Sequence, residues 1–288
     1  MDRYTALADA IPGFAKGEAL SLPGVWDGLS MRLVEQAGFA AAFLSGGALS
    51  MARHGRPDIG LVTLAELATT VSVIRETSDL PLIVDADTGF GNALNAQRTM
   101  RMLEGAGATA IQIEDQSFPK RCGHLAGKSV VPLSEYIGKL KAVLDGRRRS
   151  TLVIARTDAR SVEGFDATVA RAHACVEAGA DLLFIEGTQT RAEMETIANL
   201  FGNTVPLVHN LVEGGVTPVH TRDELSALGY AIGLHPLLLL HGFIRQAPML
   251  LVALKERGTT ADLDIADLGE FGQLLGTAAI LDAAKAFE

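Results

Sequence analysis

Acidic side chains follow several short apolar runs of the sequence, in positions where they could bind a cation together. Asp85 and Asp87 come at the end of one run and share one face if the strand continues, and Glu114 ends the next run along the chain. Buried carboxylates repel one another unless a counterion lies between them. Mg2+ and Mn2+ favour such oxygen ligands. A single Asp-x-Asp or Glu-Asp pair is more often a loop feature, but pairs at successive strand ends favour a metal site.

Arg156 also ends an apolar run, and its side chain is suited to hold an anionic substrate. An arginine at the inner end of a buried strand needs an anionic partner, and its planar fork matches a carboxylate. That partner could instead be Asp158 or Glu186, in a structural ion pair. Ser45-Gly46-Gly47 follows another run, where backbone N–H groups could cradle a carboxylate or phosphate. A simple tight turn is the alternative there.

The segment Lys120-Arg121-Cys122-Gly123-His124 carries a candidate reactive thiol. Two cations and a histidine flank Cys122, and nearby positive charge favours a thiolate. Gly123 and Gly127 give the backbone freedom to close over a bound substrate and exclude water. The alternative is an ordinary exposed loop with an incidental cysteine. Cys175 lies in a helical stretch and is predicted to be a small core residue.

Eight short apolar runs, separated by amphipathic stretches, must position these side chains. Nearly continuous apolar runs are typical of parallel strands covered on both faces. Their alternation with helices predicts a single α/β domain, residues 1–288, folded as a (β/α)8 TIM-type barrel, with an open doubly wound sheet as the alternative. In a barrel the strand ends meet at one mouth. The predicted strands are 19–22, 41–44, 82–85, 110–114, 152–156, 182–186, 207–210 and 231–234, and the predicted helices include 63–77, 93–106, 133–145, 166–178, 191–199 and 222–227.

The end of the chain, about residues 237–288, contains more helix than one barrel unit needs. We therefore expect a C-terminal helical extension, part of which packs on a neighbouring subunit or is exchanged with it. This favours a homo-oligomer, either a dimer or a homotetramer.

Composition limits the partners of the chain. The formal net charge is −9, from 25 Lys and Arg against 34 Asp and Glu, which argues against a nucleic-acid surface. No uninterrupted apolar run approaches the length of about 20 residues that spans a bilayer, and residues 1–16 do not read as a secretory signal. A cytoplasmic protein with no membrane partner is expected. Two cysteines in different surroundings make a disulfide framework improbable.

Five segments, in this order, resemble the isocitrate lyase and phosphoenolpyruvate mutase superfamily, and the resemblance runs from about Leu20 to Leu254. The loop with Cys122 resembles the lyase branch, because the phosphonate mutases and phosphonopyruvate hydrolases of the superfamily lack that cysteine. The segments are Leu44-Ser45-Gly46-Gly47, Asp85-Ala86-Asp87-Thr88-Gly89-Phe90-Gly91-Asn92, Ile113-Glu114-Asp115-Gln116, the Lys120 to His124 loop, and Ala155-Arg156-Thr157-Asp158-Ala159.

The resemblance implies a role for each candidate residue. Asp85 would bind Mg2+ or Mn2+ directly, with Asp58, Asp87 and Glu114 holding the waters of the metal. Cys122 would be the general acid, with Gly123 and His124 in a mobile gate. The implied catalytic set is Cys122, Arg156, His124 and Glu114, and the implied substrate-binding set is Ser45, Gly46, Gly47, Gly123, Arg156, Glu186 and Asn210.

The resemblance also implies the reaction, a retro-aldol cleavage of a di- or tricarboxylate with a 2-hydroxyl group. The C2–C3 bond would break to give a 2-oxo acid such as pyruvate and a carbanion that Cys122 protonates. The base stays unassigned, because Phe43 stands where some relatives carry tyrosine. Leu125, with Leu211 or Val212, suits an alkyl group and favours 2-alkylmalates such as 2,3-dimethylmalate. Methylisocitrate cleavage, oxaloacetate hydrolysis or decarboxylation, and a carboxyphosphonoenolpyruvate-type mutase reaction are the alternatives.

Overall fold

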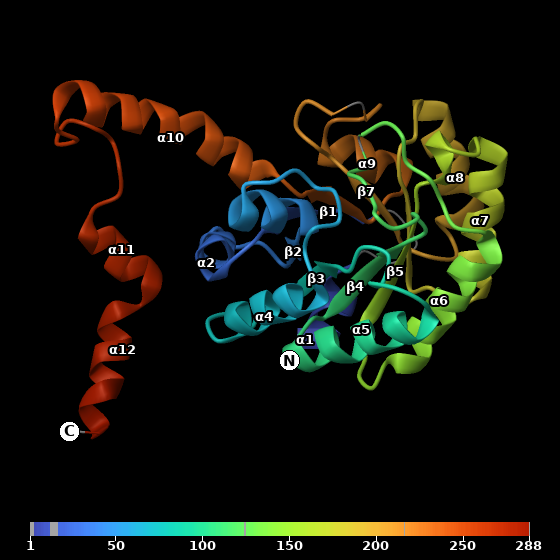
Figure 1. Cartoon of the computed structure of the whole chain (residues 1–288), viewed down its shortest axis with the longest axis horizontal. Coiled ribbons are helices and arrows are strands. Elements are labelled where there is room, and N and C mark those ends of the chain that lie inside the picture. The colour runs from blue at the N-terminus through green and yellow to red at the C-terminus, as the bar shows by residue number, and fades with distance from the viewer. Residues whose placement is uncertain (1–2, 12–16, 124, 216, 288) are drawn as a thin grey trace.

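The computed structural model describes residues 3–11, 17–123, 125–215 and 217–287, and it contains a closed barrel of eight parallel strands (Figure 1). Each strand pairs with the next along the chain, and the pairing of Leu20 with Ile232 closes the ring. This confirms the predicted barrel and rules out the open sheet. The strands are β1 (Leu20–Val25), β2 (Ala42–Leu44), β3 (Leu82–Asp85), β4 (Ala110–Glu114), β5 (Leu152–Thr157), β6 (Leu182–Ile185), β7 (Leu207–Asn210) and β8 (Ile232–His235).

Helices connect successive strands around the outside of the barrel. Their ends follow local chemistry: α4 begins with a capping box between Thr63 and Glu66, and α5 ends at Gly107 in the left-handed region. The helices are α2 (Gly28–Gln36), α3 (Gly46–Leu49), the π-helix η1 (Ser50–His54), α4 (Leu64–Arg75), α5 (Ala93–Ala106), α6 (Leu133–Gly146), the 3-10 helix η2 (Ala159–Ser161), α7 (Phe165–Glu177), α8 (Arg191–Phe201) and α9 (Arg222–Leu228).

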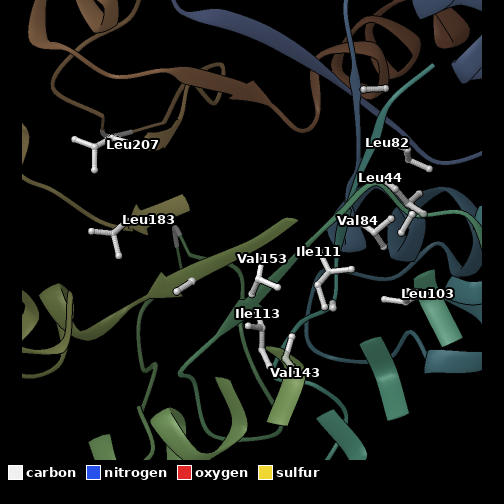
Figure 2. Close-up of a cluster of buried hydrophobic side chains, with 14 of the residues drawn as sticks. Leu44, Leu82, Val84, Leu103, Ile111, Ile113, Val143, Val153, Leu183 and Leu207 are labelled. Atoms are coloured by element: carbon white, nitrogen blue, oxygen red, sulfur yellow. The ribbon is translucent and has the colours of Figure 1, made fainter. Parts of the chain in front are cut away.

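The larger part of the core lies between the strands and this ring of helices. Successive side chains of a strand point to opposite faces, so one set faces outward and packs under the helices. Figure 2 shows this layer, in which Leu103 of α5 and Val143 of α6 lie with strand residues. Those labelled are Leu44, Leu82, Val84, Ile111, Ile113, Val153, Leu183 and Leu207.

A second apolar cluster fills the inside of the barrel, where Leu22, Phe43, Ile83 and Phe184 meet. The short helix α1 (Arg3–Ala10) adds Leu7, fully buried, to this cluster. The interior is thus a packed core rather than a pore, which leaves the carboxyl ends of the strands for chemistry.

The C-terminal helices α10 (Leu238–Arg257), α11 (Leu268–Leu275), α12 (Thr277–Ala284) and the 3-10 helix η3 (Lys285–Phe287) form the extension predicted for residues 237–288. α10 leads away from the barrel, and the chain then turns back, so that α11 contacts α2 (Figure 1). Leu240 is the one buried residue of α10, and none is buried in α11 or α12 among the residues described. By length and composition alone, α10 could also cross a membrane.

Candidate active site

Most of the predicted site residues meet around one cavity of about 220 Å³ at the carboxyl ends of the strands. Asp58, Asp85, Cys122 and Arg156 all contribute to its wall, from four separate segments of the chain. The full lining is Phe43, Ser45, Gly47, Met51, Asp58, Asp85, Gln112, Cys122, Gly123, Arg156, Asn210, Val212, Glu213, Gly214, Gly215, Pro236, Leu237 and His241.

A buried lysine gathers the acidic residues on one side of this cavity. Lys120 Nζ lies 2.6 Å from Asp58 Oδ1 and 2.9 Å from Asp87 Oδ1. Burial and the neighbouring carboxylates Asp85 and Asp58 raise the pKa of Asp87 to about 7, although Lys120 opposes the shift. Burial would lower the pKa of Lys120, but Asp87 and Asp58 outweigh it and raise that pKa well above its usual value. Positive charge therefore holds this group of carboxylates together.

The backbone conformation at Asp87 differs from the extended strand that the sequence predicted. We expected Asp85 and Asp87 to share one face of a continuing strand, but β3 ends at Asp85 and Asp87 adopts a left-handed backbone with φ of 46°. Both carboxylates still approach the same point. A Cβ atom on Gly46 would lie 3.3 Å from Asp85 Oδ2 and 3.4 Å from Asp87 Oδ1. Glycine at this position lets α3 lie directly against both carboxylates.

Ser45-Gly46-Gly47 is the start of α3 rather than a simple tight turn. The Ser45 hydroxyl accepts a hydrogen bond from the backbone N–H of Ala48 at 3.1 Å and so caps the helix. A Cβ atom on Gly47 would lie 3.3 Å from the Asp58 side chain. The helix end, with its partial positive charge, therefore faces the acidic side of the cavity.

Arg156 is surrounded by three carboxylates. Its Nε lies 2.8 Å from Asp158 Oδ2 and 3.2 Å from Glu114 Oε2, and its Nη2 lies 3.4 Å from Glu186 Oε2. Burial would lower the pKa of Arg156, but Asp158 and Glu114 raise it well above its usual value. The structural ion pairs considered from the sequence are thus present, and Arg156 nonetheless reaches the cavity wall.

The residues on the acidic side fit a divalent cation chemically. Burial raises the pKa of Glu114 well above its usual value, and neither of its carboxylate oxygens accepts a hydrogen bond from any described residue. Gln112 Oε1 is also buried without a hydrogen-bond donor in the described part of the chain. Among the described residues, no group of three or more His, Cys, Asp or Glu side chains is arranged to hold a metal ion. Lys120 occupies the position between Asp58 and Asp87 instead.

The Cys122 loop forms part of the cavity wall through Cys122 and Gly123. The backbone N–H of Cys122 donates to the carbonyl of Asp58 at 3.1 Å, and Arg121 Nη1 donates to the carbonyl of Ala126 at 3.0 Å. Gly123 lies so close to the Arg156 cluster that an added Cβ would meet Glu186 Oε2 at 2.6 Å. His124, which we also assigned to the gate, lies outside the described residues.

The opposite wall comes from the loop after β7 and from α10. Asn210 Nδ2 donates to Glu186 Oε2 at 2.8 Å, which joins two of the predicted substrate-binding residues. Val212 lines the cavity, but Leu211 is buried in the core and Leu125 is 46% exposed. Of the residues expected to meet an alkyl group, Leu125 and either Leu211 or Val212, Val212 lines the cavity and Leu125 does not.

Several cavity residues were missed from the sequence. Gln112 had a detectable signal, because it is a polar residue two positions before Glu114 on the same face of an apolar strand. Glu213 Oε1 lies 3.1 Å from His235 Nδ1, and His241 reaches the cavity from α10. Neither Glu213 nor His241 follows a strand directly, so a search for polar residues at the ends of apolar runs could not find them.

Cys122 and Cys175 form no disulfide within the part of the chain described. Cys175 is buried in the core, also as predicted, and burial raises the pKa of its thiol to about 12. Cys122 is only partly buried. The two thiols thus differ in solvent access as their sequence surroundings suggested.

Known proteins resemble the chain over most of its length. The family model described as phosphoenolpyruvate phosphomutase matches residues 14–239. A 2,3-dimethylmalate lyase of Eubacterium barkeri is 40% identical over 259 residues, which is 88% of each protein. A 2-methylisocitrate lyase of Aeropyrum pernix is 43% identical over 248 residues, which is 86% of this chain and 79% of the relative.

Solved structures agree with the sequence matches. An oxaloacetate acetylhydrolase in complex with 3,3-difluorooxalacetate is 28% identical, with a TM-score of 0.91 over 99% of this chain and 97% of the other. A phosphonopyruvate hydrolase in complex with oxalate and Mg2+ is also 28% identical, with a TM-score of 0.86 over 99% of both chains.

Proposed function

The chain belongs to the phosphoenolpyruvate mutase and isocitrate lyase superfamily, and we propose that it is a Mg2+-dependent lyase that cleaves a 2-alkylmalate to a 2-oxo acid and a short carboxylate. Its relatives named as lyases support carbon–carbon cleavage as the class of reaction. One observation carries the proposal: Cys122, Arg156 and the Asp85 carboxylate line a single small cavity.

Arg156 is proposed to bind the carboxylate that becomes part of the 2-oxo acid. A guanidinium carries five N–H donors, so Arg156 can bond Asp158 through Nε and Nη2 and still donate to a substrate carboxylate, and burial strengthens the pairing. Ser45 and the backbone N–H groups of Gly46 and Gly47 would hold its oxygen atoms from the side of α3. Glu186 and Asn210, which bond each other at 2.8 Å, would close the far side.

Asp85, with Asp58, Asp87 and Glu114, would hold Mg2+, and Mn2+ would suit the same oxygen ligands. When bound, the ion would supply positive charge to the developing oxyanion at C2 of the substrate. Lys120 would have to give up its ion pairs with Asp58 and Asp87 when the ion binds.

The proposed cleavage breaks the C2–C3 bond. The 2-hydroxyl proton leaves to a base, C2 becomes the carbonyl carbon of the 2-oxo acid, and the bonding electron pair stays on C3. Cys122 Sγ–H donates its proton to C3, and the thiolate that remains regains a proton from solvent when the loop opens. The loop would meanwhile keep water from the carbanion.

An alkyl-bearing substrate suits the apolar part of the cavity. Phe43, Met51, Val212, Pro236 and Leu237 all contribute to the wall. We therefore favour 2,3-dimethylmalate or a similar 2-alkylmalate over a tricarboxylate, for which a third anion would need a further cationic partner.

A substrate panel tests the proposal directly. Malate, 2-methylmalate, 2,3-dimethylmalate, methylisocitrate and oxaloacetate are each incubated with the protein and Mg2+, and release of the 2-oxo acid is followed. The highest kcat/KM is expected for a 2-alkylmalate. Release of oxalate from oxaloacetate alone would instead favour hydrolysis, the reaction implied by the name of one structural neighbour. Turnover of a C–P bond, followed by phosphorus NMR, would favour a mutase.

The exposed apolar side chains of the extension favour assembly of several copies. Phe243, Ile244, Met249 and Leu251 of α10 are each at least 59% exposed. We propose that a second copy of the chain covers this face, in a cytoplasmic dimer or tetramer with exchanged helices. Light scattering after size-exclusion chromatography tests this: a monomeric mass at micromolar concentration would contradict it.

A further inference from the structure

A second buried lysine, Lys128, joins the Cys122 loop to the Arg156 cluster. Its Nζ donates to the carbonyl of Gly123 at 2.6 Å and to Asp158 Oδ1 at 2.9 Å. The Lys128 side chain is 3% exposed and that of Asp158 is fully buried. One ammonium group therefore touches both the backbone beside Cys122 and the main carboxylate partner of Arg156.

This contact is separate from the way Lys120 holds the same loop. Lys120 bonds Asp58 and Asp87 on the acidic side of the cavity. The base of the loop is held by backbone contacts, with Gln116 bridging to Val130. Lys120 thus joins the loop to the acidic side of the cavity, and Lys128 joins it to the carboxylates around Arg156.

The ion pair between Lys128 and Asp158 also affects the net charge around Arg156. Asp158, Glu114 and Glu186 all lie within 3.4 Å of the guanidinium, so acidic groups outnumber it. Lys128 adds a positive charge to this cluster by pairing with Asp158. Removing that charge leaves the cluster more negative, and a negative cluster binds an anion less well.

We propose that Lys128 is a positioning residue that latches the Cys122 loop shut and, through Asp158, prepares Arg156 to bind a carboxylate. Loop closure and anion binding then strengthen each other by the same factor, because coupling between two equilibria is reciprocal. The inference depends on the proposed function only in taking Arg156 as the anion site.

Alkylation of Cys122 measures loop opening without any ligand. The variant Lys128→Gln is expected to raise the rate of modification by iodoacetamide about tenfold, as for the loss of one charge-assisted hydrogen bond. Buried Cys175 serves as the internal reference, and Lys141→Gln, at an exposed position on α6, is the matched control. Equal rates in Lys128→Gln and the native protein would overturn the latch. The melting temperature verifies that both variants fold.

Titration with oxalate in the presence of Mg2+ measures the coupling. Lys128→Gln is expected to bind oxalate about tenfold more weakly and to lose the protection that oxalate gives Cys122 against alkylation. Lys128→Arg, which keeps the charge, is expected to restore most of both. Native oxalate affinity in Lys128→Gln would overturn the link to Arg156. If the native protein bound no oxalate, the proposed function would fail, while the ligand-free alkylation rates would still decide the latch.

Discussion

Arg156 and Asp158 form a bidentate ion pair at the end of β5, with Nε 2.8 Å from Oδ2 and Nη2 3.1 Å from Oδ1. Burial would raise the pKa of Asp158, but Arg156 and Lys128 hold it below its usual value. Asp158 therefore stays ionised and fixes the plane of the guanidinium. The residue proposed to bind the substrate carboxylate is thus oriented before any substrate binds.

Arg156→Lys is expected to weaken oxalate binding about 100-fold, since lysine keeps the charge but loses the planar fork. Calorimetric titration with oxalate and Mg2+ measures the effect. Arg160→Lys is the matched control, because Arg160 pairs with Glu193 outside the cavity and should bind oxalate normally. Native affinity in Arg156→Lys would mean that the substrate carboxylate lies elsewhere.

Cys122→Ser is expected to lower kcat at least about 1,000-fold, because a hydroxyl is a much weaker acid than a thiol at this step. Oxalate with Mg2+ should still bind, since Ser and Cys have nearly the same shape. The control Cys175→Ala removes the buried thiol and should retain turnover, with some loss of stability. Near-native turnover in Cys122→Ser would exclude Cys122 as the proton donor.

Mg2+ binding is expected to depend on pH through Asp87. The pKa of Asp87 is about 7 in the folded protein, above the usual value of 3.8. Without metal, this group therefore increases the free energy of unfolding at low pH, and its contribution is lost as the pH rises from about 4 to 7. Metal needs the ionised carboxylate, so Mg2+ affinity should fall up to about tenfold per pH unit below 7.

Thermal unfolding at several pH values measures this dependence. The increase in melting temperature caused by Mg2+ should be larger at pH 8 than at pH 6, because only bound ligand stabilises the folded state. Asp87→Asn, which cannot ionise, should lose this part of the dependence. An equal Mg2+ effect at both pH values in the native protein would contradict the role of Asp87.

Gly46→Ala is expected to weaken Mg2+ binding about tenfold, because its Cβ would press on Asp85 and Asp87 at 3.3 and 3.4 Å. Gly138→Ala is the matched control. Gly138 lies exposed within α6 with nothing within 4 Å of an added Cβ, so alanine there should stabilise the helix by about 0.5–1 kcal/mol. Mg2+ titration of both variants separates the local clash from a general effect of alanine.

The barrel could be predicted from the sequence because its strands are covered on both faces. Each strand is then a nearly continuous apolar run, and each run stands out against the amphipathic helices. Helix α1 and helix α3 were not predicted. α1 buries only Tyr4 and Leu7 among its described residues, and α3 begins with Gly46 and Gly47, which disfavour helix on propensity alone.

Part of the candidate site was predictable from strand ends, because Asp85 and Glu114 end their strands and Arg156 lies one residue before the end of β5, so they converge by topology. Cys122 was found from its basic neighbours and Asp58 from the family resemblance, and both line the cavity. His241 reaches the cavity from α10, and its position depends on how that helix leaves the barrel, which no local pattern records. Likewise, Lys120 was interpreted as a neighbour of the Cys122 thiol, but its amino group pairs with Asp58 and Asp87.

Leu7 of α1 seals the amino-terminal end of the barrel, where it packs with Leu22 and Phe43 inside the ring of strands. The packed interior therefore closes the cavity toward that end of the barrel, and the Cys122 loop contributes to its wall at the carboxyl ends of the strands. Under the proposed function, both products would leave past the Cys122 loop, so the rate at which this loop opens would set an upper limit on turnover.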